Sequence, residues 1–270
     1  MKSLNGQELA DFIKERQARQ VRGLIQHDQI KPKLAIIQTV DNSVVNTYVG
    51  LKKTYGADIL IDVDVYKIPQ SMALNQIKKL NNDPTVHGII VQLPIENPDE
   101  VDEILNTIAP TKDVDGLGKD AIFDPATPTA INWLLTGYDI DLKQKIAIVG
   151  NGRLVGKPLA RMWRNSGLDV VVLDSKTEDM PDKLRSADII VTATGVPGLI
   201  KSNDIKTGAV VVDAGTADAH GEVVGDVAPD VRSRTDVMIT PKQGGVGPLT
   251  VAALMDNVIR AARGTIVLVQ

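Results

Sequence analysis

Short apolar segments rich in β-branched residues recur along the chain and alternate with segments of helical spacing. The expected strands are residues 34–40, 59–66, 88–93, 146–149, 170–173, 189–192, 210–213 and 237–240. Continuous apolar strands that alternate with helices are typical of parallel sheets that are covered on both faces. The pattern therefore predicts an α/β protein.

Apolar residues at helical spacing lie between these strands. The expected helices are residues 42–56, 71–80, 98–108, 130–135 and 249–262. In the first of them, Ser43 is expected to cap the start and Gly56 the end. We interpret the apolar stripes of these helices as core packing.

The alternation breaks at residues 111–128, which are rich in Asp, Gly, Pro and Thr and have weak periodicity. Such a segment is typical of a crossing between domains that carries functional loops. A new strand–helix series begins at Lys145. We predict an N-terminal α/β substrate domain of residues 1–117 and a Rossmann-type dinucleotide-binding domain of residues 118–248. The last helix and the residues after it, 249–270, are expected to pack back on the first domain.

Composition argues against several classes of function. The 270 residues include no cysteine, which excludes disulfides and thiolate chemistry and favours a reducing cytoplasm. A net charge of −4 and 3% aromatic residues argue against nucleic-acid binding, which needs a basic surface. We expect neither a membrane span, because no apolar run approaches about 18 residues, nor a secretory signal. His27, His87 and His220 lack paired metal-ligand spacing, so we expect no metal site.

A glycine-rich turn follows the fourth expected strand. Gly150, Gly152 and Gly156 give the spacing G-x-G-x-x-x-G, in which Val155 occupies the usual third-glycine position. At the start of a helix, such a turn presents backbone N–H groups to a pyrophosphate. We therefore predict a bound dinucleotide. The expected cofactor-binding residues are Gly150, Asn151, Gly152, Arg153, Asp174, Ser175 and Thr216.

The ends of the following strands supply the rest of this predicted site. Asp174, at the tip of the next strand, is placed to accept hydrogen bonds from ribose hydroxyls, or is a simple cap or turn residue. Small residues at 193–195 and 213–216 follow the two strands after it, where a nicotinamide ring would lie. Near the end of the chain, the segment 244–250 combines three glycines with Pro248, so its main chain can approach a flat ligand closely. We expect a helix to start after it, at Leu249 or Thr250.

Polar residues of the first domain form a candidate catalytic face. Tyr48 and Lys52 are four residues apart on one expected helix, so they share a face, although such pairs are also common on solvated helices. A partly desolvated amine can move protons near neutral pH. Gln92 ends an apolar strand at the edge where ligands of α/β proteins bind. Asp113 and Asp115 flank a valine before a glycine, and either of them can be a simple turn residue.

These residues resemble those of the bifunctional methylenetetrahydrofolate dehydrogenase/methenyltetrahydrofolate cyclohydrolase enzymes, and the resemblance runs from end to end. The matching stretches are Tyr48-Val49-x-x-Lys52, Val86-His87-Gly88-Ile89-Ile90-Val91-Gln92-Leu93-Pro94, Lys112-Asp113-Val114-Asp115-Gly116, Pro125-x-Thr127-Pro128, Val155-Gly156-Lys157-Pro158, Gly225-Asp226-Val227 and the loop from Gly244. Several of them are highly specific, and their order agrees with that of the family.

The resemblance implies a folate substrate in a cleft between two domains and NADP or NAD as cofactor. It implies that Lys52 handles protons in the hydrolytic step, that Gln92 orients this lysine, that Tyr48 packs on or bonds to the folate, and that Asp115 grips the donor edge of the pterin. The implied substrate-binding residues are Tyr48, Gln92, Leu93, Asp115, Gly245 and Pro248. It also implies a cytoplasmic homodimer in one-carbon metabolism that serves purine biosynthesis.

Two departures from the family pattern bear on the cofactor. Asn151 and Gly152 stand where the family usually has Arg-Ser, and Asp174 stands where a basic residue or histidine is usual. Both changes remove affinity for a 2′-phosphate, which Arg153 and Lys176 could partly restore. We therefore predict a preference for NAD.

Three functions are compatible with these residues. The leading one is oxidation of 5,10-methylenetetrahydrofolate followed by hydrolysis of the methenyl product to 10-formyltetrahydrofolate. The second, a dehydrogenase without hydrolytic activity, is disfavoured because Tyr48, Lys52, Gln92 and Asp115 are all present. The third is a non-catalytic dinucleotide-binding relative, which the altered cofactor turn allows.

Overall fold

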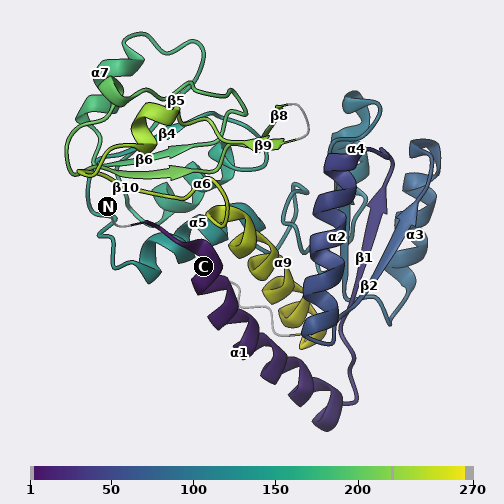
Figure 1. Cartoon of the computed structure of the whole chain (residues 1–270). Helices are drawn as coiled ribbons and strands as arrows, with labels where there is room; N and C mark the ends of the chain where they lie inside the picture. The colour runs from purple at the N-terminus through teal and green to yellow at the C-terminus, as the bar shows by residue number, and fades with distance from the viewer. Residues whose placement is uncertain (1–2, 220–221, 265–270) are drawn as a thin grey trace. The chain divides into compact units, whose positions relative to one another are not determined.

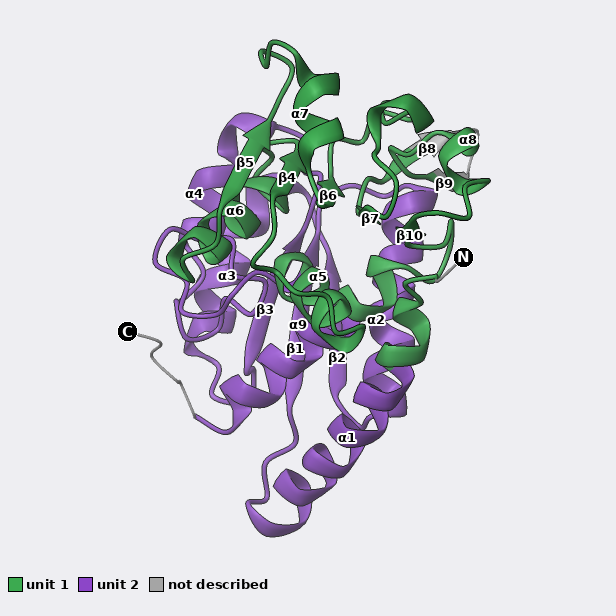
Figure 2. Cartoon of the chain, turned by 90° about the vertical axis from the view of Figure 1, so that its left-hand side faces the viewer, with its two compact units in different colours: residues 1–10, 127–250 green, residues 11–126, 251–270 purple. Residues whose placement is uncertain are grey.

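The structure is a computed structural model that describes residues 3–219 and 222–264. It divides into two compact units (Figure 2). Unit 1 comprises Met1–Ala10 and Thr127–Thr250, and unit 2 comprises Asp11–Ala126 and Val251–Gln270. Residues 265–270, which were expected to pack with the first domain, lie outside the described residues.

Unit 2 contains a parallel sheet in the order β2-β1-β3 (Figure 1). Its strands are β1 (Lys33–Gln38), β2 (Asp62–Lys67) and β3 (Gly88–Gln92), which confirms the first three expected strands with shifted bounds. The register pairs Gln38 with Gln92, so two amide side chains end adjacent strands at the same level. The carboxyl edge of this sheet is therefore polar.

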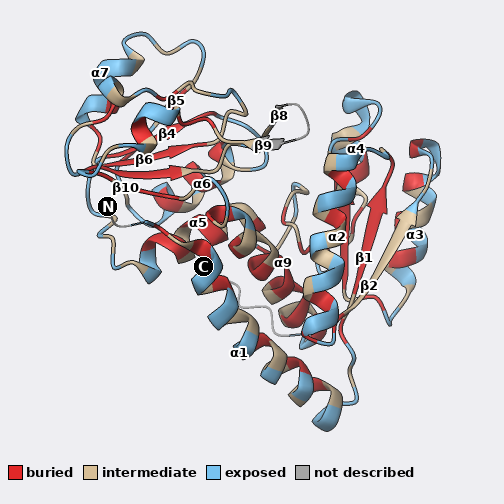
Figure 3. Cartoon of the chain, in the orientation of Figure 1, coloured by how far each residue is buried: buried red, intermediate tan, exposed pale blue. Residues whose placement is uncertain are grey.

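Helices cover both faces of this sheet (Figure 1). They are α2 (Ser43–Asp58), α3 (Ala73–Asn82) and α4 (Val101–Asn106), with 3₁₀ turns at Gln70–Met72 and Pro98–Glu100. Ala35 and Ile37 of β1 pack in one apolar cluster with Ile77 of α3 and Ile104 of α4. This cluster is the core of one face, as the burial pattern in Figure 3 shows.

The expected caps of α2 were wrong. Asn42 is the N-cap, because its side-chain Oδ1 accepts a hydrogen bond from the Val45 N–H at 2.8 Å, and Ser43 is already helical. Gly56 lies within the helix rather than at its end. A Cβ at Gly56 would lie 2.6 Å from a methyl of Val63 in β2, so glycine is needed there for close packing of α2 on the sheet.

Two long helices lie at the ends of the chain. The sequence analysis did not predict α1 (Gly6–His27), and α9 (Val246–Ala262) starts earlier than expected. In unit 2, the fully buried Gln17 of α1 donates to the backbone oxygen of Ala252 in α9 at 2.8 Å and accepts from the Tyr55 hydroxyl of α2 at 2.8 Å. The last helix, α9, therefore packs on unit 2, which holds the first of the two sheets along the chain, as predicted.

The N-terminal segment groups differently from the prediction, which placed residues 1–117 in one domain. The Leu4 N–H donates to the backbone oxygen of Ile239 at 3.0 Å, and the Gln7 N–H donates to that of Gly244 at 3.0 Å. These bonds attach the start of the chain to unit 1.

Unit 1 contains a five-stranded parallel sheet in the order β10-β7-β6-β4-β5. Its strands are β4 (Ile146–Val149), β5 (Val170–Leu173), β6 (Ile189–Thr192), β7 (Val210–Asp213) and β10 (Met238–Ile239), all of them expected. Its helices are α5 (Ala126–Gly137), α6 (Gly156–Asn165), α7 (Met180–Ser186) and α8 (Pro229–Arg232). An antiparallel hairpin of β8 (Ala217–Ala219) and β9 (Glu222–Val224) was not predicted. The strand order reverses at β4, and α/β sheets bind ligands at the carboxyl ends of the strands around such a switch point.

Candidate active site

Lys52 and Gln92 form the centre of the polar edge of unit 2. Lys52 lies on α2 and donates from Nζ to Oε1 of Gln92, the last residue of β3, at 2.8 Å. The Gln92 Nε2 donates to the backbone oxygen of Leu93 at 2.9 Å, which fixes the amide so that its oxygen faces the lysine. Burial lowers the pKa of the Lys52 ammonium from its ordinary value, and the charge of Asp115 partly opposes this shift. The amine is thus poised to exchange protons nearer to neutral pH than an exposed lysine.

Asp115 is brought to the same edge by a segment that runs beside β3. The Ile89 N–H donates to the backbone oxygen of Lys112 at 2.7 Å, and Ile89 and Asp113 form a parallel bridge. The buried Asn257 of α9 donates to the backbone oxygen of Val114 at 2.9 Å and so holds the segment from its other side. Asp115 follows directly after this anchored stretch.

Burial raises the pKa of Asp115 to about 6, with Lys52 acting in the opposite direction and Asp113 in the same direction. The two aspartates have separate roles. The buried Asp113 carboxylate accepts from the backbone N–H groups of Gly116 at 3.1 Å and Gly118 at 2.7 Å, so Asp113 is the turn residue. Asp115 interacts electrostatically with Lys52, and its contact with a ligand stays a prediction.

Tyr48 lies one turn before Lys52 on α2 and is partly buried. Leu93 follows Gln92 directly, and its peptide bond to Pro94 is cis. The structure therefore brings Tyr48, Lys52, Gln92, Leu93 and Asp115 to one unit. Gly245 and Pro248 belong to unit 1, so their contact with the same substrate stays a prediction.

The glycine loop has a clear local reason for its sequence. Gly244 has a φ of +78°, and a Cβ on Gly6 would lie 1.8 Å from the backbone oxygen of Gly245. The loop and the start of α1 are therefore packed main chain against main chain. The expected helix start at Leu249 or Thr250 was wrong, because α9 begins at Val246.

The cofactor turn of unit 1 has the compact geometry that a dinucleotide cradle needs. Gly150 has a φ of +104°, and a Cβ there would lie 2.6 Å from the backbone oxygen of Ala193. A Cβ on Gly156, the first residue of α6, would lie 1.8 Å from the Gly150 oxygen. A Cβ on Gly152 would meet nothing within 4 Å, so the space above this residue is open. The turn thus fits a pyrophosphate group at the start of α6.

Asp174 follows β5 and Thr216 comes after β7, and β4 and β6 lie between these two strands in the sheet. The Gly150 N–H donates to the backbone oxygen of Leu173 at 2.8 Å, which places Asp174 beside the turn. Asp174 Oδ1 accepts from the Lys176 N–H at 2.9 Å, so one carboxylate oxygen stabilises a local turn. Ser175 is exposed next to it. Thr216 follows β7, and a Cβ on Gly195 would lie 3.4 Å from its backbone oxygen.

Family models match nearly the whole chain. Residues 4–115 match the tetrahydrofolate dehydrogenase/cyclohydrolase catalytic domain, and residues 125–266 match the NAD(P)-binding domain of the same enzymes. The chain belongs to the tetrahydrofolate dehydrogenase/cyclohydrolase family. It is a bifunctional enzyme that oxidises 5,10-methylenetetrahydrofolate with a nicotinamide dinucleotide and hydrolyses the methenyl product to 10-formyltetrahydrofolate.

Individual tetrahydrofolate dehydrogenase/cyclohydrolases agree with this assignment. The bifunctional protein FolD of Hydrogenobaculum sp. is 39% identical over 97% of this chain and 98% of its own length. The crystal structure of FolD from Campylobacter jejuni superposes with a TM-score of 0.91 at 36% identity and covers 98% of this chain and 99% of its own. The Trypanosoma brucei FolD complexed with NADP cofactor and inhibitor gives a TM-score of 0.90 at 30% identity, with coverage of 97% of both chains.

Sequence reasoning missed Gln38 in this member of the tetrahydrofolate dehydrogenase/cyclohydrolase family. Gln38 is 2% exposed, and its Nε2 donates to Asn46 Oδ1 of α2 at 2.9 Å. It therefore ties α2 to β1 at Asn46, whereas Lys52, later on the same helix, ties α2 to β3 through Gln92. The signal was available, because Gln38 ends an apolar strand in the same way as Gln92.

Other kinds of site have little support in the described part of the chain. No cluster of histidine, cysteine, aspartate or glutamate there has the geometry of a metal site, and His220 lies outside the described residues. No helix among the described residues is long and apolar enough to span a membrane.

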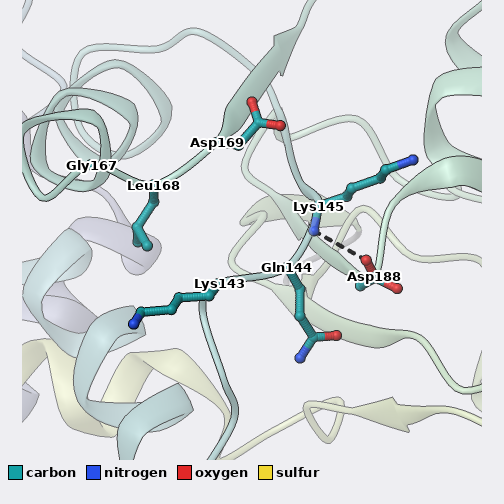
Figure 4. Close-up of a pocket in the computed structure, with 7 residues that line it drawn as sticks. All are labelled: Lys143, Gln144, Lys145, Gly167, Leu168, Asp169 and Asp188. Atoms are coloured by element: carbon teal, nitrogen blue, oxygen red, sulfur yellow. Dashed lines mark hydrogen bonds between the residues drawn. The ribbon is translucent and has the colours of Figure 1, made fainter.

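A hollow of about 500 Å³ lies at the amino ends of β4, β5 and β6 (Figure 4). Its lining residues are Lys143, Gln144, Lys145, Gly167, Leu168, Asp169 and Asp188. The Lys145 N–H donates to Asp188 Oδ2 at 3.1 Å across it. Because the glycine turn at 150–156 is at the carboxyl end of β4, the hollow is at the opposite edge of the sheet from that turn.

Proposed function

We propose that Lys52 moves the protons of the cyclohydrolase step. The observation that carries this assignment is the 2.8 Å hydrogen bond from Lys52 Nζ to Gln92 Oε1. Gln92 is a neutral acceptor, so it orients the amine without requiring it to stay charged. Burial, which lowers the pKa of Lys52, increases the neutral fraction that can accept a proton.

The hydrolytic step needs a group that both accepts and donates a proton. Water adds to the carbon of the methenyl bridge and loses a proton. The bond from that carbon to one ring nitrogen then breaks, and this nitrogen takes up a proton as the formyl group forms. An amine near its pKa performs both transfers in sequence.

We propose that Asp115 binds the pterin. A carboxylate that accepts two parallel N–H bonds is well suited to the donor edge of this ring. With a pKa of about 6, Asp115 is mostly ionised at neutral pH and can accept those bonds. Tyr48 and Leu93 would contact the folate from the same unit, and Gly245 and Pro248 would line it from the glycine loop, as the resemblance implies.

The dehydrogenase step makes different demands on the chain. The nicotinamide dinucleotide, when bound, accepts the hydride. The chain has to bind the cofactor and align the donor carbon with it, because the two flanking nitrogens of the folate stabilise the resulting cation. We propose that the backbone N–H groups from Gly150 to Arg153 hold the pyrophosphate and that Ser175 and Thr216 border the bound dinucleotide.

A preference for NAD over NADP is part of the proposal. Asp174 Oδ1 is engaged by the Lys176 N–H, and Oδ2 of the same carboxylate would face the ribose and repel a 2′-phosphate. Asn151 and Gly152 bring no positive charge to offset this repulsion. Initial rates with NAD and NADP under equal conditions test the preference, and a tenfold advantage for NADP would overturn it.

We further propose that unit 2 carries the folate site and unit 1 the cofactor site. From the resemblance we also propose a cytoplasmic homodimer that supplies one-carbon units to purine biosynthesis. The edge strand β5, whose Val171 is 47% exposed, is compatible with a partner on unit 1. Light scattering coupled to size-exclusion chromatography tests the dimer.

One assay tests the whole assignment. Nicotinamide reduction and methenyl decay are followed in the same cuvette after addition of 5,10-methylenetetrahydrofolate. Reduction followed by decay is expected. Reduction with a methenyl intermediate that decays only at the uncatalysed rate would identify a dehydrogenase alone, and absence of both signals would identify a non-catalytic relative.

A further inference from the structure

Asp226 is a fully buried carboxylate whose hydrogen bonds are incomplete. It follows β9, and its residue exposure is 0%. Oδ2 accepts from the Thr192 hydroxyl at 2.6 Å and from the Thr194 N–H at 2.6 Å, and both donors are uncharged. Oδ1 is buried without a hydrogen-bond partner. A buried carboxylate in this state is costly, so its presence here calls for an explanation.

Asp213, beside Asp226, has a positively charged partner, which Asp226 lacks among its hydrogen-bond donors. Its side chain is 2% exposed, and its Oδ2 pairs with Arg232 at 2.5 Å. Its Oδ1 accepts from the Asp226 N–H at 2.9 Å, so the two aspartates belong to one network. Arg232 balances the charge of Asp213, whereas the hydrogen-bond donors of Asp226 are neutral. The network therefore carries more negative than positive charge.

The unbalanced charge lies at the carboxyl ends of two adjacent strands. Thr192 ends β6 and Asp213 ends β7, and the two residues are register partners. A Cβ on Gly215 would lie 2.1 Å from Asp226 Oδ1, so this oxygen lies directly against the segment after β7. Strands β6 and β7 lie on the other side of the switch point from β5. In Rossmann sheets the nicotinamide half of a dinucleotide binds on that side, at β6 and β7.

We propose that Asp226 is a positioning residue that holds the segment after β6 at Thr194, lies against the segment after β7 at Gly215, and gives both a negative field that favours oxidised, positively charged nicotinamide over the neutral reduced ring. The inference rests on the proposed placement of the nicotinamide at residues 193–195 and 213–216, and it holds for NAD and NADP alike. A unit charge about 10 Å away, at an effective dielectric constant of about 20, changes a binding constant by roughly tenfold.

Asp226→Asn tests the proposal, because an amide oxygen can still accept from Thr192 and Thr194 while the charge is removed. The dissociation constants of the oxidised and reduced cofactor are measured by titration calorimetry and by the fluorescence of the reduced ring. We expect the affinity for the oxidised form, relative to the reduced form, to fall by roughly tenfold. Asp230→Asn is the matched control, since it removes the same charge from an exposed residue at the start of α8. It should leave the ratio unchanged.

The second activity of the enzyme reports on folding. Methenyl hydrolysis depends on Lys52 in unit 2 and should survive in Asp226→Asn. If it is lost, Asp226→Ser, which removes the charge without bulk next to Gly215, takes the place of the first variant. Equal weakening of both cofactor forms would overturn the proposed field. No effect on either form, with the dehydrogenase intact, would overturn the placement of the nicotinamide as well.

Discussion

Replacing Lys52 with methionine should separate the two activities of this enzyme. Methionine keeps much of the length and apolar surface of the lysine but cannot exchange a proton. Positioned acid–base groups contribute roughly 10²–10⁴-fold to rates, so methenyl hydrolysis should fall by at least about 100-fold. The dehydrogenase should persist, because hydride transfer depends on alignment of donor and acceptor rather than on a proton-transfer residue.

The same substitution has a second, quantitative consequence at Asp115. Lys52 lowers the pKa of Asp115, which is nonetheless raised to about 6 by burial. In Lys52→Met this pKa should rise further, so more of the carboxyl is neutral at pH 7 and binds the pterin less well. Folate affinity should therefore be reduced at pH 7 and recover as the pH is raised above the new pKa.

The assays are direct. Methenyl decay measures the hydrolase, nicotinamide reduction measures the dehydrogenase, and calorimetric titration with a folate analogue across pH measures binding. Lys53→Met is the matched control, since Lys53 is the exposed neighbour of Lys52 on α2 and its loss should change neither activity. Unchanged methenyl hydrolysis in Lys52→Met would refute the assignment of Lys52.

Three further substitutions probe other parts of the account. Asp115→Asn should abolish tight folate binding and yet raise the free energy of unfolding at pH 8 by up to about 3 kcal/mol, because the pKa of Asp115 in the folded protein, about 6, exceeds the ordinary 3.8. This gain in stability should vanish as the pH falls towards 3.8. Denaturant titrations that show the same gain at every pH would contradict the prediction. Gly156→Ala places a Cβ 1.8 Å from the Gly150 oxygen, so the dehydrogenase should be lost with hydrolysis retained, whereas Gly23→Ala, with nothing within 4 Å, should preserve both rates. Asp174→Ser should raise kcat/KM for NADP relative to NAD by roughly tenfold through loss of one repulsive charge; steady-state rates with both cofactors decide this, and an unchanged ratio would remove Asp174 from the explanation.

The sheets were predictable from the sequence because their strands are continuous apolar runs. A parallel strand that is covered on both faces is buried at every position, so its whole sequence is apolar, as at residues 146–149 and 189–192. The helix α1 was missed because its apolar residues are mixed with many charged ones, and Phe12 on it is 69% exposed. Its buried face combines apolar residues such as Val21 and Leu24 with the polar Gln17, which carries no hydrophobic signal.

The candidate site shows the same division. Helix periodicity places Tyr48 and Lys52 on one face, and Gln92 ends an apolar strand; both are local properties. The pairing of Lys52 with Gln92 was implied only by the family resemblance, and the structure shows their hydrogen bond at 2.8 Å. Asp113 binds a local turn through the N–H groups of Gly116 and Gly118. The interaction of Asp115 with Lys52 is not local, because it depends on the pairing of the segment at 112–115 with β3. Gln38 was overlooked because the expected strand ran to residue 40, which placed Gln38 inside the strand rather than at its end.

A crystal structure with a bound folate analogue is the most direct test of the central claim. The account predicts that Lys52 Nζ lies within hydrogen-bond reach of the one-carbon bridge, with its bond to Gln92 retained. An ammonium group that points into solvent, or that lies far from the bridge, would contradict it.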